Sequence, residues 1–197
     1  MSCRVLLCGV GGQGTILAAH VLADVAMACG DDVKVSEIHG MAQRGGSVTT
    51  VVTFGDHVSS MVSGIGESDM LVSFDKLEAL RNMDQLVAGG ALIVNDELIK
   101  PASVLTGRNQ VPSDADQVLE GAGALMVPAD AIAREAGNAH CANVVMLGAL
   151  SHSLAFDEGA WLDSISKSVP PKTVDVNLAA FRAGRAFAEE HSNQTRE

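Results

Sequence analysis

The sequence is poor in aromatic residues and in positive charge. Aromatic side chains make up 3% of its 197 residues, and tyrosine is absent. The core must therefore be built mainly from valine, leucine, isoleucine, alanine and methionine. Lysine and arginine total 13 against 24 aspartates and glutamates, which gives a formal net charge of −11 at pH 7. This charge disfavours binding to nucleic acids or anionic membranes, because either would need a basic surface.

Paired cysteines and long apolar runs are also missing. The four cysteines, at positions 3, 8, 29 and 141, form no C-x-x-C pair. The chain therefore offers no ligand set of its own for zinc or an iron–sulfur cluster, and we expect buried, reduced thiols. The apolar run at residues 144–150 is too short to cross a membrane, and no signal-peptide core follows residues 1–4. These features favour a cytoplasmic location.

Two common catalytic motifs are absent as well. The sequence contains neither a G-x-S-x-G nucleophile elbow nor a G-x-x-x-x-G-K-[ST] phosphate loop. We therefore predict no catalytic residue and no metal ligand from motifs of this kind.

Glycine, by contrast, is concentrated near the start of the chain. The hexapeptide GVGGQG at residues 9–14 lies between an apolar run at 5–8 and an apolar-periodic stretch at 16–28. Gly9, Gly11 and Gly14 fit G-x-G-x-x-G, which is typical of a strand, a tight turn and a helix start that bind a phosphate. The amides of the helix start would face an anion. A purely structural glycine turn is the alternative.

The next segment completes a β-α-β unit. Residues 33–38 alternate like a strand that follows a right-handed crossover. Glu37 lies at the carboxyl end of that strand, where an acidic residue binds ribose hydroxyls in dinucleotide-binding folds. An ordinary strand-end carboxylate is equally compatible with the pattern. No second crossover helix follows, and the chain instead turns on glycines. We expect residues 48–54 and 57–62 to form an antiparallel hairpin around Gly55 and Asp56.

The remaining elements continue a strand–helix rhythm. Strands are predicted at residues 70–73, 91–95 and 124–127. One helix is predicted to begin at the Asp75 cap and to end at Gly89 and Gly90. Further helices are predicted at residues 128–136, 144–150 and 174–188. Residues 96–123 are expected to be irregular, with a short strand at 104–105. The pattern predicts one α/β domain over residues 1–190, with a polar tail at 191–197. Its fold should be a Rossmann-like layered sheet, mostly parallel with an antiparallel hairpin, and with helices on both faces.

A second concentration of polar residues follows the second strand. The guanidinium of Arg44 beside Gly45 and Gly46 would let a phosphate or carboxylate approach closely; a hairpin turn with a solvated arginine is the alternative. For His39, a structural and an acid–base role are equally compatible. Because ligands of such sheets bind at the carboxyl ends of the strands, we predict a binding site formed by Gly9, Gly11, Gly12, Gln13, Gly14, Glu37, His39, Gln43, Arg44, Gly45 and Gly46.

Together these segments carry a family likeness. GVGGQG, SEIHGMAQRGGSV, LVSFDKLEAL and GGALIVND resemble the gamma-type subunit or domain of 2-oxoacid:ferredoxin oxidoreductases, over essentially the whole chain. The combination of Glu37 with residues 39–46 is most similar to the beta subunits of indolepyruvate ferredoxin oxidoreductases.

The resemblance implies one subunit of an enzyme that decarboxylates a 2-oxoacid on thiamine diphosphate, reduces ferredoxin through iron–sulfur clusters and forms an acyl-CoA. Since this chain has neither a cysteine cluster motif nor a recognisable thiamine-diphosphate motif, the resemblance implies that both cofactors lie on a larger alpha subunit and that the isolated chain is inactive. In related single-chain enzymes the equivalent domain helps to bind coenzyme A. By analogy, residues 11–14 and 44–46 would contact CoA phosphates or the partner's active site.

Other interpretations remain open at this stage. The chain would also suit the gamma subunit of a pyruvate or branched-chain 2-oxoacid oxidoreductase, a free-standing NAD-binding protein, or a non-enzymatic nucleotide-binding scaffold. In addition, we expect an apolar surface that includes part of residues 144–150 or of residues 48–62 to face the larger subunit or a second copy in a homodimer.

Overall fold

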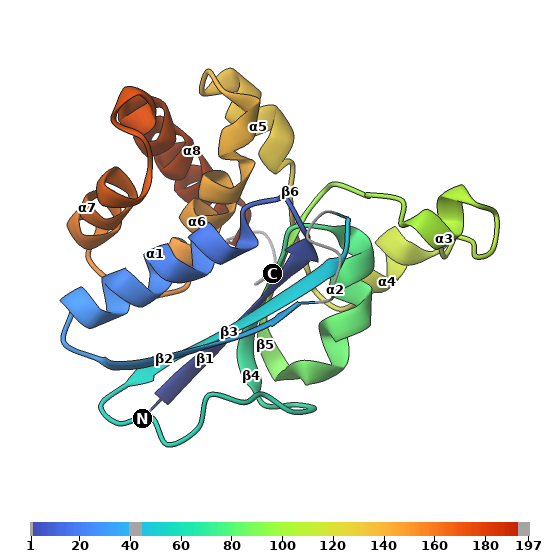
Figure 1. The fold of residues 1–197 in the computed structure, drawn as a ribbon, viewed down its shortest axis with the longest axis horizontal. Helices are drawn as coiled ribbons and strands as arrows, with labels where there is room; N and C mark the ends of the chain where they lie inside the picture. Colours follow the sequence, from blue (N-terminus) through green and yellow to red (C-terminus); the bar gives the residue numbers. More distant parts are fainter. Residues whose placement is uncertain (1, 40–44, 193–197) are drawn as a thin grey trace.

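A computed structural model describes residues 2–39 and 45–192 and shows one six-stranded sheet with helices on both faces (Figure 1). The strand order is β2-β3-β1-β4-β5-β6. Strands β1, β4, β5 and β6 run parallel, whereas β3 is antiparallel to both β1 and β2. The strands are β1 (Ser2–Val10), β2 (Asp32–His39), β3 (Ser47–Gly55), β4 (Ser68–Ser73), β5 (Leu86–Asn95) and β6 (Leu125–Val127). The predicted α/β class is confirmed.

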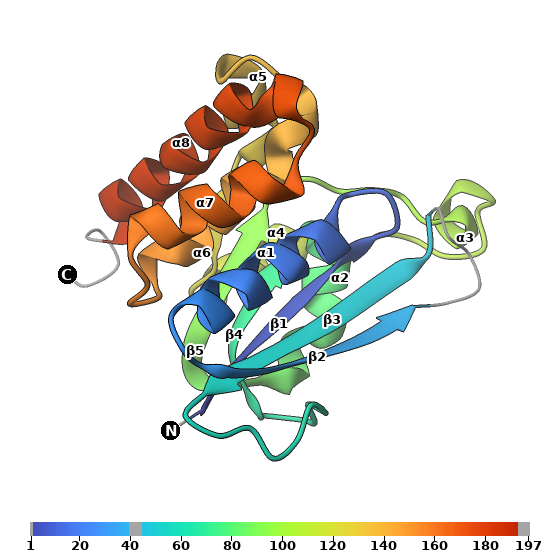
Figure 2. The same cartoon turned by 60° about the vertical axis from the view of Figure 1, so that its left-hand side comes forward.

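The helices form two unequal layers. One face of the sheet is covered by α1 (Thr15–Ala28), α5 (Ala129–Glu135), α6 (Ala142–His152), α7 (Glu158–Ser168) and α8 (Val174–Ser192) (Figure 2). The other face is covered by α2 (Lys76–Asn82) and α4 (Ala115–Gly121). The short helix α3 (Ala102–Leu105) and the 3-10 turns η1 (Met83–Gln85), η2 (Ala139–Cys141) and η3 (Pro171–Thr173) complete the described elements. No helix within the described ranges is long and apolar enough to cross a membrane.

Strand β1 is buried from both sides. Val5 and Leu7 pack into the larger helix layer, while Leu6 and Cys8 pack against the layer of α2 and α4. This follows from the two-residue period of a strand, which sends successive side chains to opposite faces. A strand that is buried on both faces reads as a continuous apolar run, as residues 5–8 do.

The antiparallel hairpin differs from the predicted one. Strand β3 pairs with β2, with Val35 opposite Val52, and residues 57–62 form a loop rather than a strand. Side chains of β2 hold that loop in place, because the Val58 amide donates to Asp32 Oδ2 at 2.8 Å and Lys34 Nζ donates to the Val58 carbonyl. Strand β3 therefore lies between β1 and β2, the two parallel strands of the predicted β-α-β unit.

The helix predicted from Asp75 to Gly89 and Gly90 is shorter in the structure. Asp75 caps α2 as expected, accepting from the Leu77 amide at 2.8 Å. However, α2 ends at Asn82, and Gly89 and Gly90 lie inside β5 instead of stopping a helix. A Cβ at Gly90 would come within 2.7 Å of the Asp69 carbonyl oxygen, so this glycine allows β4 and β5 to approach each other closely.

The predicted irregular region contains helices. Residues 104–105 end α3 rather than forming a strand, and α4 lies within the same region. Helix α4 is stabilised by the side chain of Leu119, which is fully buried in the core on the same face of the sheet as α2.

The four thiols differ in their burial. Cys8 and Cys141 are buried and Cys3 is half-buried, but Cys29 is exposed at the end of α1, contrary to expectation. Burial raises the pKa of Cys8 to about 12 and that of Cys3 to about 11. These two thiols are therefore protonated, and so unreactive, at neutral pH.

Helices α6 and α8 pack through glycine. A Cβ at Gly148 would come within 2.0 Å of the Phe181 carbonyl oxygen, and one at Gly184 within 2.0 Å of the Val145 carbonyl oxygen. Residues 144–150 are completely buried by this contact and by the sheet. The expectation that this helix offers an apolar surface to a partner is therefore wrong, since its side chains already form the core.

We expect Gly184→Ala to destabilise the protein, because the added methyl group would overlap the α6 main chain. Overpacking of this kind costs about 1–3 kcal/mol of unfolding free energy, and each kcal/mol lowers Tm by roughly 2–4 °C in a chain of this size. Gly121→Ala in α4 is the matched control, since a Cβ there meets nothing within 4 Å. Equal melting temperatures for the two variants would contradict the close packing of α6 and α8.

Candidate functional site

The two glycine segments predicted to form a site meet at the carboxyl end of β1. The Gly11 amide donates to the Gly46 carbonyl at 2.8 Å, and the Gly45 amide donates to the Gly11 carbonyl at 3.3 Å. These bonds continue the β1–β3 ladder, in which Val10 lies opposite Ser47. The glycine loop after β1 and the turn before β3 therefore form one continuous unit of main chain.

Close contacts explain why glycine occupies both ends of the loop. A Cβ at Gly9 would lie 3.0 Å from both Phe74 Cβ and Thr15 Oγ1. Gly14, the residue before α1, has φ +80°, and a Cβ there would lie 2.4 Å from Asn143 Nδ2. The first glycine thus lets the loop approach β4, and the last lets α1 approach the start of α6.

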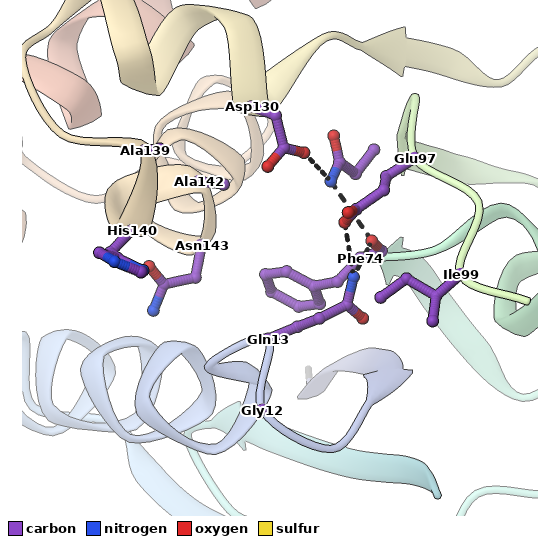
Figure 3. Close-up of a pocket in the computed structure, with 11 residues that line it drawn as sticks. Gly12, Gln13, Phe74, Glu97, Ile99, Asp130, Ala139, His140, Ala142 and Asn143 are labelled. Carbon is purple, nitrogen blue, oxygen red and sulfur yellow. Dashed lines mark hydrogen bonds between the residues drawn. The ribbon is translucent and has the colours of Figure 1, made fainter. Parts of the chain in front are cut away.

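Gln13 joins the loop to the neighbouring strands. Its Oε1 accepts from the Val10 amide at 2.7 Å, and its Nε2 donates to the Phe74 carbonyl at 2.7 Å and to Glu97 Oε2 at 2.9 Å (Figure 3). The Gln13 side chain therefore holds together the end of β1, the end of β4 and the segment after β5. Both ends of its amide are engaged inside the protein.

Asn95 extends this network towards α5. Its Nδ2 donates to Asp130 Oδ2 at 3.0 Å and to the Phe74 carbonyl at 3.3 Å, while its Oδ1 accepts from the Ala129 amide at 3.1 Å. The side chain of Asn95 thus satisfies an amide at the start of α5, which has no capping side chain of its own. The Phe74 carbonyl is shared by Gln13 and Asn95.

A cleft of about 200 Å³ opens above this network, between the starts of α1 and α6. Figure 3 shows side chains from both sides of the cleft converging on it. Its lining consists of Gly12, Gln13, Phe74, Asn95, Glu97, Ile99, Asp130, Ala139, His140, Ala142 and Asn143. Of these, only Gly12 and Gln13 were predicted from the sequence. Asn95 ends the predicted strand at 91–95 and Glu97 lies two residues beyond it, so the strand-end rule that led to Glu37 would also have found them.

The cleft is acidic. Burial raises the pKa of Glu97, and the negative charges of Asp130 and Asp75 raise it further, while the Gln13 hydrogen bond and Arg134 act in the opposite direction. Carboxylates of the cleft lie beside the loop that would hold a pyrophosphate in a dinucleotide-binding fold. Repulsion between like charges therefore disfavours a dinucleotide in this cleft.

The other residues of the predicted site do not line the cleft or fall outside the described residues. Glu37 is exposed on the edge strand β2, opposite Thr50, and does not line the cleft. The main chain of His39 pairs with Val48. Gln43 and Arg44 fall outside the described residues. Of the predicted site, the structure thus brings together residues 9–14 with Gly45 and Gly46.

A smaller hollow behind the turn contains a buried carboxylate that sequence reasoning missed. Glu78 of α2 accepts from Ser47 Oγ at 2.5 Å and forms an ion pair with Arg81. The hollow has a volume of about 30 Å³ and borders Gly45. Glu78 therefore fixes the start of β3, directly after the turn that pairs with the glycine loop.

Metal ligation is not supported by the side chains that the structure describes. Within residues 2–39 and 45–192, no three histidine, cysteine, aspartate or glutamate side chains lie close enough together to hold a metal ion.

Comparison with known proteins gives a consistent result. The family model for pyruvate ferredoxin/flavodoxin oxidoreductase matches residues 4–187. The indolepyruvate oxidoreductase subunit IorB of Thermococcus kodakarensis is 39% identical over 194 residues, which cover 95% of this chain and 96% of that protein. The ketoisovalerate oxidoreductase subunit VorA of Methanothermobacter thermautotrophicus is 31% identical over 193 residues, which cover 95% of this chain but 37% of VorA.

A solved structure shows the same fold. The gamma subunit of a keto/oxoacid ferredoxin oxidoreductase from Geobacter sulfurreducens superposes with a TM-score of 0.71 at 24% identity, covering 95% of this chain and 99% of that one.

The raised pKa of Glu97 makes a prediction about stability and pH. Folding raises the pKa of Glu97, so the folded protein binds a proton at this carboxyl group more tightly than the unfolded chain does. The resulting stabilisation is complete at pH values below the pKa of the unfolded chain, and it is lost as the pH rises through the pKa of the folded protein. Glu97→Gln, which keeps an oxygen acceptor for Gln13, should therefore melt at a higher temperature than the unmodified protein at about pH 7, with a smaller difference at about pH 4. Melting curves of both proteins at the two pH values measure this effect.

Glu120→Gln, on the exposed side of α4, is the control and should show no such change between the two pH values. A lower melting temperature for Glu97→Gln at neutral pH would mean that the carboxylate stabilises the strand ends.

Proposed function

The chain belongs to the pyruvate ferredoxin/flavodoxin oxidoreductase family, and we propose that it is the small subunit of an indolepyruvate-type 2-oxoacid:ferredoxin oxidoreductase. The complex would convert an aryl 2-oxoacid, CoA and oxidised ferredoxin into an arylacetyl-CoA, carbon dioxide and reduced ferredoxin. The observation that carries this proposal is the 39% identity to IorB over nearly the full length of both chains. The family resemblance seen in the sequence is thereby confirmed.

We propose that the cofactors of this reaction reside on a larger alpha subunit. When bound, thiamine diphosphate supplies the carbanion chemistry of decarboxylation, and iron–sulfur clusters carry the electrons to ferredoxin. The cysteines of this chain do not fit a cluster site, since Cys8 and Cys141 are buried separately, Cys3 is half-buried, and Cys29 is exposed at the end of α1. The role left to this chain is assembly, and closure of the substrate site.

The proposed contact region is the unit formed by the glycine loop and the turn before β3. Residues 11–14 and 44–46 would contact the phosphates of CoA or the partner's active site. The pairing of Gly11 with Gly45 and Gly46 supports this proposal, because it places the residue after Arg44 beside the glycine loop. A single domain over residues 1–190, a polar tail and a cytoplasmic location are parts of the same proposal.

The acidic cleft argues against the NAD-binding alternative. A pyrophosphate at the start of α1 would lie near Glu97, which accepts from Gln13 inside the loop. Glu37, the residue expected to bind the ribose, lies on the edge strand and away from the cleft. The branched-chain alternative is supported by identities of 31% and 29% to two VorA subunits, which are lower than the 39% identity to IorB.

The test is steady-state kinetics of the complex assembled from this chain and the larger subunit, with indolepyruvate, pyruvate and 3-methyl-2-oxobutanoate compared as substrates. We expect kcat/KM for indolepyruvate to exceed the others by at least about tenfold, since a pocket matched to an aryl group gains apolar burial that small oxoacids do not provide. Neither subunit alone should be active. A preference for 3-methyl-2-oxobutanoate would favour the branched-chain alternative, and micromolar NAD binding by the isolated chain would favour the dehydrogenase alternative.

The same assay tests Arg44. Loss of one charge-assisted, two-pronged contact costs about 1.5–3 kcal/mol, so Arg44→Lys should reduce kcat/KM for CoA by roughly ten- to a hundredfold without lowering Tm. Arg108→Lys, in the exposed segment after α3, is the control. Unchanged kinetics for Arg44→Lys and Arg44→Ala would rule out the contact.

A further inference from the structure

The loop between β3 and β4 exposes a group of large apolar side chains. Met61, Val62 and Ile65 are 45%, 65% and 80% exposed, and they lie within five consecutive residues. We call residues 56–67, which include these three side chains, the apolar loop. Single exposed apolar residues are common on protein surfaces, but three on one short loop indicate a contact surface.

The main chain of the apolar loop is held firmly in place. The Val58 amide donates to Asp32 Oδ2 at 2.8 Å, the Gly66 amide to the Asp84 carbonyl at 2.8 Å, and the Glu67 amide to the Gln85 carbonyl at 3.0 Å. These bonds tie the loop to β2 and to η1. Because both ends of the loop are already fixed, less conformational entropy would be lost on binding a partner than for a loop without these bonds.

The apolar loop lies far from the candidate site. It connects the end of β3 to the start of β4 and lies beside the N-terminus, at the end of the sheet opposite the glycine loop in both ribbon views (Figures 1 and 2). The apolar loop is therefore a separate surface from the cleft and the glycine loop, and a substitution in it changes no residue of the candidate site.

Acidic side chains surround the apolar loop. Asp56, Glu67, Asp69 and Asp84 are all exposed, and they lie within the loop or in the segments that hold it. Two of these carboxylates have cationic partners, because Arg4 pairs with Glu67 at 3.1 Å and a hydrogen bond from the amino-terminal group lowers the pKa of Asp56. Asp69 and Asp84 add two further negative charges. The rim therefore keeps a negative charge around an apolar centre.

We propose that the apolar loop and its acidic rim dock into an apolar socket rimmed by lysine or arginine on the larger subunit. This inference rests on the proposed function. A second copy of this chain is a poor occupant, because a twofold contact places the same patch against itself and would bring acid against acid. The comparison with VorA is compatible with a different chain as the partner, since the segment similar to this chain makes up 37% of that longer protein.

The test measures binding between the full-length chain and the purified larger subunit by calorimetry. The double variant Val62→Ser/Ile65→Ser should bind at least about tenfold more weakly, because it removes apolar area that the complex buries. Asp84→Lys should also weaken binding, and binding by the unmodified chain should weaken between about 0.05 and 0.5 M salt as the rim charges are screened. Val118→Ser, which changes an exposed apolar residue on α4, is the control and should bind within about twofold of the unmodified chain.

The possible failures can be told apart. If the unmodified chain binds the larger subunit and the double variant binds equally well, the docking surface is overturned while the proposed function stands. Failure of the unmodified chain to bind at all would overturn the proposed function and the docking surface together. If sedimentation shows a homodimer that the double variant disrupts, the occupant is a second copy and the choice of partner is wrong.

Discussion

The arrangement of the site depends on the side-chain amide of Gln13. Strands β1, β4 and β5 end at the same edge of the sheet, and the four glycines of the loop have no side chains with which to hold them. Gln13 supplies the missing contacts, with an acceptor for the Val10 amide and donors for the Phe74 carbonyl and Glu97. The bonds to the main chain are worth about 1 kcal/mol each, and together with the bond to Glu97 they fix the loop relative to two neighbouring strands.

The same contacts distinguish this loop from a dinucleotide site. In a dinucleotide-binding fold the space at the start of the first helix stays open for a pyrophosphate. Here Gln13 and Glu97 line the cleft on that side, while Gly45 and Gly46 pair with Gly11 on the other. A G-x-G-x-x-G motif thus serves main-chain packing and close helix contact as much as ligand binding. This is consistent with a subunit that completes a site on a partner instead of holding a cofactor alone.

Sequence patterns predicted the local elements better than their pairing. The buried run at residues 5–8, the Asp75 cap and the presence of a helix at 144–150 follow from periodicity and capping, which are local. The hairpin partner of β3 and the role of Gly90 depend on contacts between distant segments, namely Val58 with Asp32 and Gly90 with Asp69. Asp130 could not be predicted as a cleft residue, because its place there depends on the packing of the start of α5 against Asn95.

The most direct test of this account is amide hydrogen exchange in the isolated chain. If Gln13 fixes the glycine loop before any partner binds, the amides of Val10 and Gly11 should be protected in the unmodified protein. In Gln13→Ala both should lose protection, while the amide of Val72 in the core strand β4 should keep it. Rapid exchange at Val10 and Gly11 in the unmodified chain, equal to that in Gln13→Ala, would contradict the account.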